Sequence, residues 1–279
     1  MRIINLIENT KGNEECLYEH GLSFYIETPK HKIIVDMGAT DKFIYNSEKL
    51  GVNLEDVDMC VLSHGHYDHS GGILGLYEVN KNACLLMNNL AGEDYYHVYY
   101  DENGNYVSER YIGIDKRILN LPNVRMIESD ITLDEEISVF TGVKGRRLWP
   151  KGNLALKVKK NNVFYQDEFE HEQYLVIKEG NNSVLVSGCA HNGILNILDR
   201  YKEIYDEYPN YVISGFHMMN KSGYSVEDIE IIKETANELK KLGIKFFTGH
   251  CTGEIPFEIM KEIMGERICY VHSGEYFEL

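Results

Sequence analysis

The stretch SHGHYDHSGG, at residues 63–72, holds the most informative side chains of this 279-residue chain. Three histidines and one aspartate occupy six consecutive positions: His64, His66, Asp68 and His69. The apolar run at 59–62 directly before them reads as a buried strand, so the following loop can gather these groups at the carboxyl end of the strand. Neutral imidazole is a good ligand for zinc, iron or manganese, and a carboxylate adds an oxygen donor. The stretch therefore predicts a metal site.

A single histidine is more often a surface residue or a hydrogen-bonded core residue than a metal ligand. Three histidines and an aspartate buried together without a metal, however, would leave many ring nitrogens in need of partners. His64 and His66 are two positions apart and can face the same side of an extended backbone, whereas Asp68 and His69 fall in the next turn and can face a second position. Two metal ions are therefore expected. Gly71 and Gly72 allow close backbone approach after the loop.

Outward from this stretch, the sequence predicts a layered α/β or α+β fold with sheets covered by helices. Strand signals come first, at residues 2–8, 22–28, 31–38 and 58–65, and strands and helices alternate in the second half. Three helices are expected at residues 40–50, 192–205 and 225–243, the last with Ser225 as N-cap, Asp228 three residues later and Gly243 just past its end. We expect a hairpin turn at 180–182, and a single domain over 1–279 with a less regular insertion or lid within 76–150.

The composition sets limits on the partners of the protein. A formal net charge of −16 and a pI near 5.1 oppose a broad nucleic-acid or anionic-membrane surface, although a metal centre can still attract an anionic substrate. The first ten residues read as a strand rather than a signal peptide, and no apolar run is long enough to span a bilayer. The six cysteines are scattered, which is typical of reduced thiols, and we expect a cytoplasmic location. The oligomeric state is left open.

The pattern His64-x-His66-x-Asp68-His69 resembles the signature of the metallo-β-lactamase-fold hydrolases. The segment IIVDMGA at 33–39 is similar to an earlier strand of that family, and the resemblance implies that Asp36 supports the metal site. It also implies a four-layer αββα sandwich of two mixed sheets. In that family the first two histidines serve one metal, and the aspartate and the third histidine serve the second.

Later segments resemble one branch of this family, which includes an archaeal dihydropterin-type phosphate synthase and bacterial relatives. These are SGCAHNGI at 187–194, ISGFH at 213–217, TGHCTGE at 248–254 and VHSGEYFEL at 271–279. His191 and His250 each follow an apolar strand, which is the placement that a ligand needs, so we expect both to bind metal. Since relatives with a diiron site have glutamate where this chain has His66, the resemblance favours zinc, with manganese or iron as alternatives, and hydrolysis over oxygen chemistry.

Cys189 stands where many relatives have an aspartate that bridges the two metals. A small buried cysteine is the favoured interpretation, and a thiolate ligand is the alternative. His217 follows a strand and is interpreted as a substrate-side or proton-transfer group, with a plain loop histidine as the alternative. His97 is not expected to bind metal. Four further histidines are expected to be structural or exposed: His20, His31, His171 and His272. Cys251, next to His250, is not expected to take part in the site.

Three functions are compatible with this pattern. The first is a metal-dependent hydrolase in which two ions activate water against a small phosphate ester or a related ester, with Asp68 orienting the water and His217 protonating the leaving group. The second is a transferase similar to the pterin-type synthase, and the third is a metal-dependent binding module without turnover. Arg146, Arg147 and Lys151 are candidates for holding a phosphate, with a solvated basic loop as the alternative.

Overall fold

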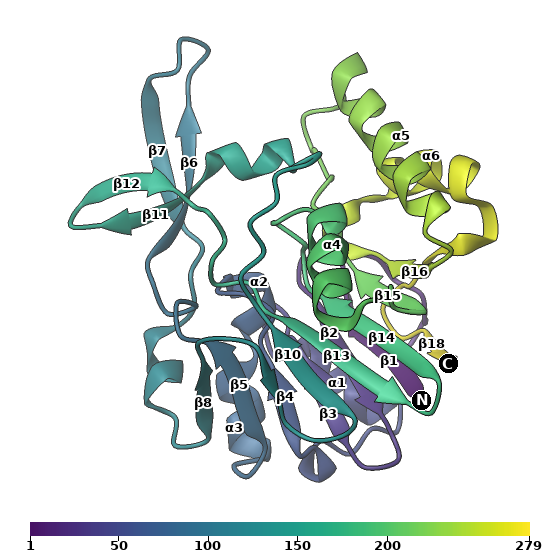
Figure 1. Cartoon of the computed structure of the whole chain (residues 1–279). Helices are drawn as coiled ribbons and strands as arrows, with labels where there is room; N and C mark the ends of the chain where they lie inside the picture. The colour runs from purple at the N-terminus through teal and green to yellow at the C-terminus, as the bar shows by residue number, and fades with distance from the viewer.

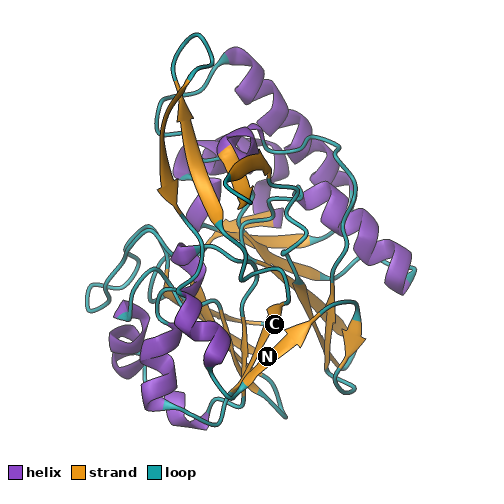
Figure 2. Cartoon of the chain, turned by 90° about the vertical axis from the view of Figure 1, so that its left-hand side faces the viewer, coloured by secondary structure: helices purple, strands orange, loops and turns teal.

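Two seven-stranded sheets lie face to face in the computed structural model, which describes residues 1–279 (Figure 1). The first sheet has the order β18-β1-β2-β3-β4-β5-β8, antiparallel from β18 to β3 and parallel from β3 to β8. Its strands are β1 (Arg2–Ile7), β2 (Ser23–Glu27), β3 (Lys32–Val35), β4 (Met59–Val61), β5 (Cys84–Asn88), β8 (Val124–Ile127) and β18 (Tyr276–Glu278). The first and last strands pair, so the two chain ends lie side by side (Figure 2).

The second sheet has the order β17-β16-β15-β14-β13-β10-β9, parallel from β17 to β14 and antiparallel from β14 to β9. Its strands are β9 (Ile131–Thr132), β10 (Ile137–Phe140), β13 (Tyr174–Glu179), β14 (Asn182–Ser187), β15 (Tyr211–Ser214), β16 (Lys245–Thr248) and β17 (Ile268–Tyr270). Both sheets are therefore mixed, as the family resemblance implied.

The alternation of side chains along each strand explains the four layers. Ile33 and Val35 of β3 point into the core between the two sheets, whereas Ile34 points to the outer face of the first sheet. Val184 of β14 likewise joins the core between the sheets, and Leu185 joins the core on the outer face of the second sheet. Because both faces of each sheet are apolar, each outer face needs a covering of helices.

Helices cover both outer faces, and Figure 2 shows the strands between them. The first sheet is covered by α1 (Lys42–Lys49) and α3 (Ile73–Val79), and the second by α4 (Ile194–Tyr205), α5 (Val226–Lys241) and α6 (Glu254–Met264). The short helix α2 (Tyr67–Ser70) and five 3-10 turns complete the chain: η1 (Leu54–Asp56), η2 (Lys116–Asn120), η3 (Lys151–Ala155), η4 (His250–Thr252) and η5 (Gly265–Arg267). This arrangement confirms the predicted αββα sandwich. None of the helices combines the length and the apolar composition that crossing a bilayer would require.

The local predictions for the second half are confirmed. The hairpin of β13 and β14 turns at Gly180, whose φ of 59° suits glycine. Ser225 and Asp228 form a reciprocal capping box at the start of α5, with the Asp228 backbone N–H donating to the Ser225 hydroxyl (3.1 Å). Gly243, just past the end of that helix, has a φ of 76°.

A third, four-stranded sheet stands beside the sandwich (Figure 1). Its order is β12-β11-β6-β7, built from β6 (Tyr95–Tyr100), β7 (Tyr106–Tyr111), β11 (Leu156–Lys160) and β12 (Val163–Gln166). The segment that was expected to be less regular contains the strands β6 and β7, because aromatic and β-branched side chains at 95–100 and 106–111 favour strands and the intervening Asn and Gly form only a turn. The insertion or lid within 76–150 remains a prediction.

Candidate metal centre

The predicted ligands lie along one edge of the sandwich, at the carboxyl ends of neighbouring parallel strands. Residues 64–69 follow β4, and Asp36 follows β3 in the first sheet. His191 follows β14, His217 follows β15 and His250 follows β16 in the second sheet. Because the carboxyl ends of parallel strands meet at one edge, the fold brings together side chains that lie far apart in the sequence.

Asp36 lies beneath the centre and contacts residues that position its histidines. One carboxylate oxygen accepts from the Ser63 backbone N–H (2.8 Å), and the other accepts from the Ser63 hydroxyl (2.8 Å) and lies 2.6 Å from His69 Nδ1. The Ser63 hydroxyl also lies 2.8 Å from His64 Nδ1. These contacts occupy the Nδ1 atoms of both histidines, so their Nε2 atoms face the centre.

Close backbone packing holds the loop in place. A Cβ atom on Gly71 would lie 2.0 Å from the carbonyl oxygen of Ala39, and one on Gly72 would lie 2.4 Å from that of Met37. The close approach expected of these two glycines is therefore confirmed.

The first group of candidate ligands consists of His64, His66 and His191, all of them buried. His64 Nε2 lies 3.0 Å from His66 Nδ1, and the ring of His191 lies 4.9 and 4.8 Å from those of His64 and His66. His191 Nδ1 contacts the Asn153 side-chain oxygen (2.9 Å), which aims Nε2 at the other two rings. Three imidazoles that converge in this way can hold one ion.

The second group consists of Asp68, His69 and His250. One carboxylate oxygen of Asp68 lies 3.8 Å from His69 Nε2 and 3.5 Å from His250 Nε2. His250 Nδ1 contacts the Asn9 side-chain oxygen (2.9 Å), so its Nε2 atom is free to face the carboxylate. The structure thus brings together all six residues that the sequence proposed as ligands, in two adjacent groups.

Burial sets the protonation of these histidines. Burial is the largest cause that lowers the pKa of His64 and His191 well below the ordinary value and that of His66 to about 3, and neighbouring histidines add to the effect. These rings are therefore neutral near pH 7, the form that binds metal. Burial also opposes the charged form of His69, but the Asp36 and Asp68 carboxylates outweigh it and raise the pKa of His69 to about 9.

Unpartnered nitrogen atoms show that the residues suit a metal. The Nε2 atoms of His191 and His250, one in each group, are buried and make no hydrogen bond. Buried polar atoms without a partner are costly, and a divalent ion at each group would satisfy them. The donors, imidazole nitrogens with one carboxylate, are those that zinc, manganese and iron accept.

Cys189 lies between the two groups. Its sulfur lies 3.2 Å from His69 Nε2, and it falls within 4.8 Å of donor atoms of both groups, with His64 and His191 on one side and with His69 and His250 on the other. Burial raises the pKa of this thiol well above its ordinary value. The position matches that of a bridging residue, so both interpretations made from the sequence stay open here.

Cys251 and His217 lie beside Cys189. The three donor atoms are within 4.8 Å of one another, and the His217 backbone N–H donates to Cys251 Sγ (3.3 Å). His217 has a φ of 48°, an uncommon value for a non-glycine residue. Its ring lies 4.1 Å from that of His191 and lines a cavity next to the centre. This places His217 where a substrate-side group would be.

One histidine, His20, has a different role from the one expected. His20 lies 3.4 Å from the Asp68 carboxylate through Nε2 and stacks on His250 at 5.1 Å, so it borders the second group. His20 precedes β2, which runs antiparallel to β3, so the start of β2 lies at the edge where β3 ends. His20 therefore does not follow a strand, which is the position that pointed to the other residues of the centre. His171 is buried and structural, as expected, since its Nδ1 accepts from the Gly65 backbone N–H (2.9 Å).

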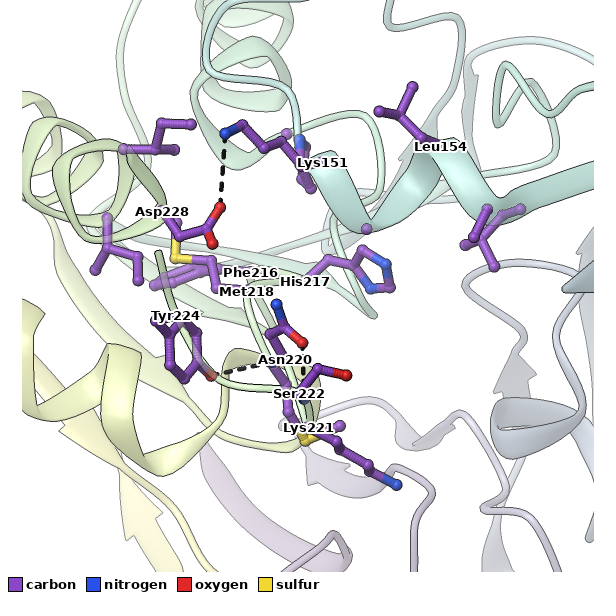
Figure 3. A pocket seen from close by; sticks show the side chains of 18 of the residues that line it. Lys151, Leu154, Phe216, His217, Met218, Asn220, Lys221, Ser222, Tyr224 and Asp228 are labelled. Carbon is purple, nitrogen blue, oxygen red and sulfur yellow. Dashed lines mark hydrogen bonds and ion pairs between the residues drawn. The ribbon is translucent and has the colours of Figure 1, made fainter. Parts of the chain in front are cut away.

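A cavity of about 750 Å³ opens beside the centre (Figure 3). His20 and His217 form its border with the candidate ligands, and its walls come from the third sheet, from η3, from the loop after β15 and from α5. Among the candidate phosphate-binding residues, Lys151 lines this cavity and Arg146 and Arg147 do not. All three make ion pairs with carboxylates: Arg146 with Glu168, Arg147 with Asp199 and Glu238, and Lys151 with Glu227 and Asp228.

Comparisons with known proteins agree with this geometry. Residues 19–136 match the family model of the metallo-β-lactamase superfamily. A solved structure of a metal-dependent hydrolase of the β-lactamase superfamily, Tm1679, superposes with a TM-score of 0.80 at 29% identity over 100% of this chain and 99% of that one. The chain therefore contains a metallo-β-lactamase superfamily domain and has the metallo-β-lactamase fold.

Named relatives differ in activity. The chain is 29% identical over 298 residues to a 7,8-dihydropterin-6-methyl-4-(β-D-ribofuranosyl)-aminobenzene-5'-phosphate synthase of Methanocaldococcus jannaschii, covering 99% of this chain and 95% of that protein. It is also 29% identical over 152 residues to a UPF0173 metal-dependent hydrolase of Staphylococcus aureus, covering 49% of this chain and 62% of that protein. Proteins that are similar to this chain in sequence thus have different named activities.

Proposed function

We propose that this protein is a hydrolase that uses two divalent metal ions, most simply zinc, to cleave a small phosphate ester or a related ester. The observation that supports this most strongly is the placement of Cys189, whose sulfur lies within 4.8 Å of donor atoms of His64 and His191 and also of donor atoms of His69 and His250. His64, His66 and His191 would hold one ion, and Asp68, His69 and His250 the other. Two adjacent ions activate water and stabilise negative charge on the substrate.

The protein side chains would position and protonate the reactants. Asp68 has an oxygen within 4 Å of both His69 and His250 and would accept a hydrogen bond from the attacking water. His217 lines the cavity, and its Nδ1 atom is buried without a partner. It would donate a proton to the leaving group.

A transferase reaction is the second candidate function, because the archaeal relative that matches almost the whole chain has a synthase name. In that case an amine or an aryl carbon would take the place of water at the same centre. The two functions differ in whether turnover needs a second organic substrate.

A metal and substrate survey tests the proposal. Protein purified without chelator would be analysed for metal content and assayed with bis(4-nitrophenyl) phosphate, 4-nitrophenyl phosphate and 4-nitrophenyl acetate, before and after chelation. We expect about two ions per chain and ester cleavage that chelation abolishes. Turnover that needs an added amine or aryl co-substrate would favour the transferase. Full metal content without turnover, both with the esters alone and with an added co-substrate, would identify a binding module instead.

A further inference from the structure

Apolar side chains form a large part of the walls of the cavity beside the metal centre. Of the 26 residues that line it, 13 are hydrophobic, and they come from β6, from residues 148–156, from the start of α4, from the loop after β15 and from α5. Examples are Leu154, Phe216, Met218, Tyr224 and Ile232. Such walls can bury the apolar body of a small molecule.

The net charge of the side chains that line this cavity is opposite in sign to the net charge of the whole protein. The chain has a formal net charge of −16, yet the charged residues that line the cavity are Arg110, Lys151, Lys221 and one carboxylate, Asp228. Lys151 lies 3.6 Å from Asp228 and 2.8 Å from Glu227. Figure 3 shows Lys151 reaching across to Asp228, with Lys221 pointing away from that pair. Lys151 and Asp228 therefore neutralise each other, and the net charge of the walls is positive.

Arg110 makes no ion pair, although the chain offers many carboxylates. It lies in β7 directly opposite His97 of β6, and both residues line the cavity. Its guanidinium lies 5.4 Å from the centre of the Tyr67 ring, and Tyr67 stands between two candidate ligands, His66 and Asp68. The aromatic contact therefore holds Arg110 close to the metal centre but outside the two ligand groups.

Lys221 is the second cation of the cavity without an ion pair. It lies in the loop that follows His217, on the wall formed by that loop. Arg110 and Lys221 thus approach the cavity from different elements, the third sheet and the second sheet.

We propose that Arg110, supported by Lys221, binds an anionic group of the substrate that is separate from the group attacked at the metal centre. The guanidinium presents a planar pair of N–H donors that suits a carboxylate or a phosphate, and no protein carboxylate occupies it. The substrate is then a molecule with an apolar body and a terminal carboxylate or phosphate. This inference rests on the proposed function, because it takes the cavity as the substrate site of that reaction.

Matched probes test the subsite without requiring turnover. Dissociation constants of 4-phenylbutanoate, 4-phenylbutyl phosphate and the neutral 4-phenylbutanamide would be measured by ligand-observed NMR on the metal-loaded protein. We expect at least one anionic probe to bind the wild type about tenfold more tightly than the amide. Arg110→Gln should remove that preference, Arg110→Lys should restore part of it, and Lys221→Gln should reduce it by a smaller factor.

Arg125→Gln is the control variant. Arg125 lies on β8, outside the cavity, and also makes no ion pair, so its substitution removes the same charge from a different place. We expect it to leave all three dissociation constants unchanged. The inference would be overturned if Arg110→Gln weakened the binding of the anionic and neutral probes equally. It would also be overturned if this variant kept the preference of the wild type for the anionic probes.

Metal content and ester cleavage are followed in the same samples. Ester cleavage with no Arg110-dependent preference overturns the inference and leaves the proposed hydrolase standing. An Arg110-dependent preference without any ester cleavage supports the subsite and overturns the hydrolase.

Discussion

Asp36 Oδ2 lies 2.6 Å from His69 Nδ1, and both side chains are fully buried beneath the candidate metal centre. The same carboxylate also accepts two hydrogen bonds from Ser63. Asp36 itself has a φ of 58°, which is uncommon for a non-glycine residue. Several contacts thus depend on one carboxylate that does not face the centre itself.

Replacing Asp36 with asparagine should weaken metal binding. The amide cannot supply the charge that orients His69 and raises its basicity, so we expect metal affinity to fall about 10- to 100-fold. Competition with a chromophoric chelator measures this. Asp56→Asn, which removes an exposed carboxylate paired with Lys32, should leave affinity unchanged. Unaltered affinity in Asp36→Asn would show that Asp36 supports only the fold.

Replacing His66 with alanine should remove metal and leave the fold intact. His66 Nδ1 lies 3.0 Å from His64 Nε2, so this nitrogen faces the first ligand group. We expect metal content to fall from about two ions to about one or fewer, with loss of activity and an unchanged far-ultraviolet circular dichroism spectrum.

His97→Ala provides the comparison for that variant. His97 lines the cavity but belongs to neither ligand group, so elemental analysis should find its metal content unchanged. Full metal stoichiometry in His66→Ala would rule out His66 as a ligand.

Much of the centre could be predicted because each ligand follows an apolar strand. His64, His191 and His250 all stand in this position, and strand ends meet at one edge in a layered α/β fold. No comparable signal marks His20, which precedes a strand and reaches the same edge only because β2 runs antiparallel to β3. Arg110 was also missed, because its place near the centre depends on the packing of the third sheet against Tyr67.

The stability of the folded state should also depend on pH through His31, which lies outside the metal centre. Its ring nitrogens lie 2.6 Å from Asp58 and 2.8 Å from Asp134. Partial burial opposes protonation, but the two carboxylates outweigh it and raise the pKa of His31. A raised pKa means that this stabilisation is complete below the unfolded-state pKa and is lost as the pH rises through the folded-state value.

His31→Gln should therefore destabilise the protein more at about pH 5.5 than at about pH 8.5, by up to about 1 kcal/mol. Chemical denaturation of the chelated protein at both pH values measures the difference in the free energy of unfolding. Introducing the same change into an Asp58→Asn, Asp134→Asn background should abolish the pH dependence. A larger loss at the higher pH would contradict the assigned sign.

Replacing Cys189 with serine decides between the two interpretations of that residue. Its sulfur lies 3.2 Å from His69 Nε2 and within 4.8 Å of donors from both groups, which is where a shared ligand would stand. Although burial alone keeps the thiol protonated, a metal ion favours the thiolate, so we expect Cys189→Ser to lose about one of two ions. Cobalt-substituted wild type should show a thiolate-to-cobalt charge-transfer band that the variant lacks. Cys60→Ser, in the core away from the centre, should keep both the metal and the band. Retention of both by Cys189→Ser would instead establish that this side chain only packs.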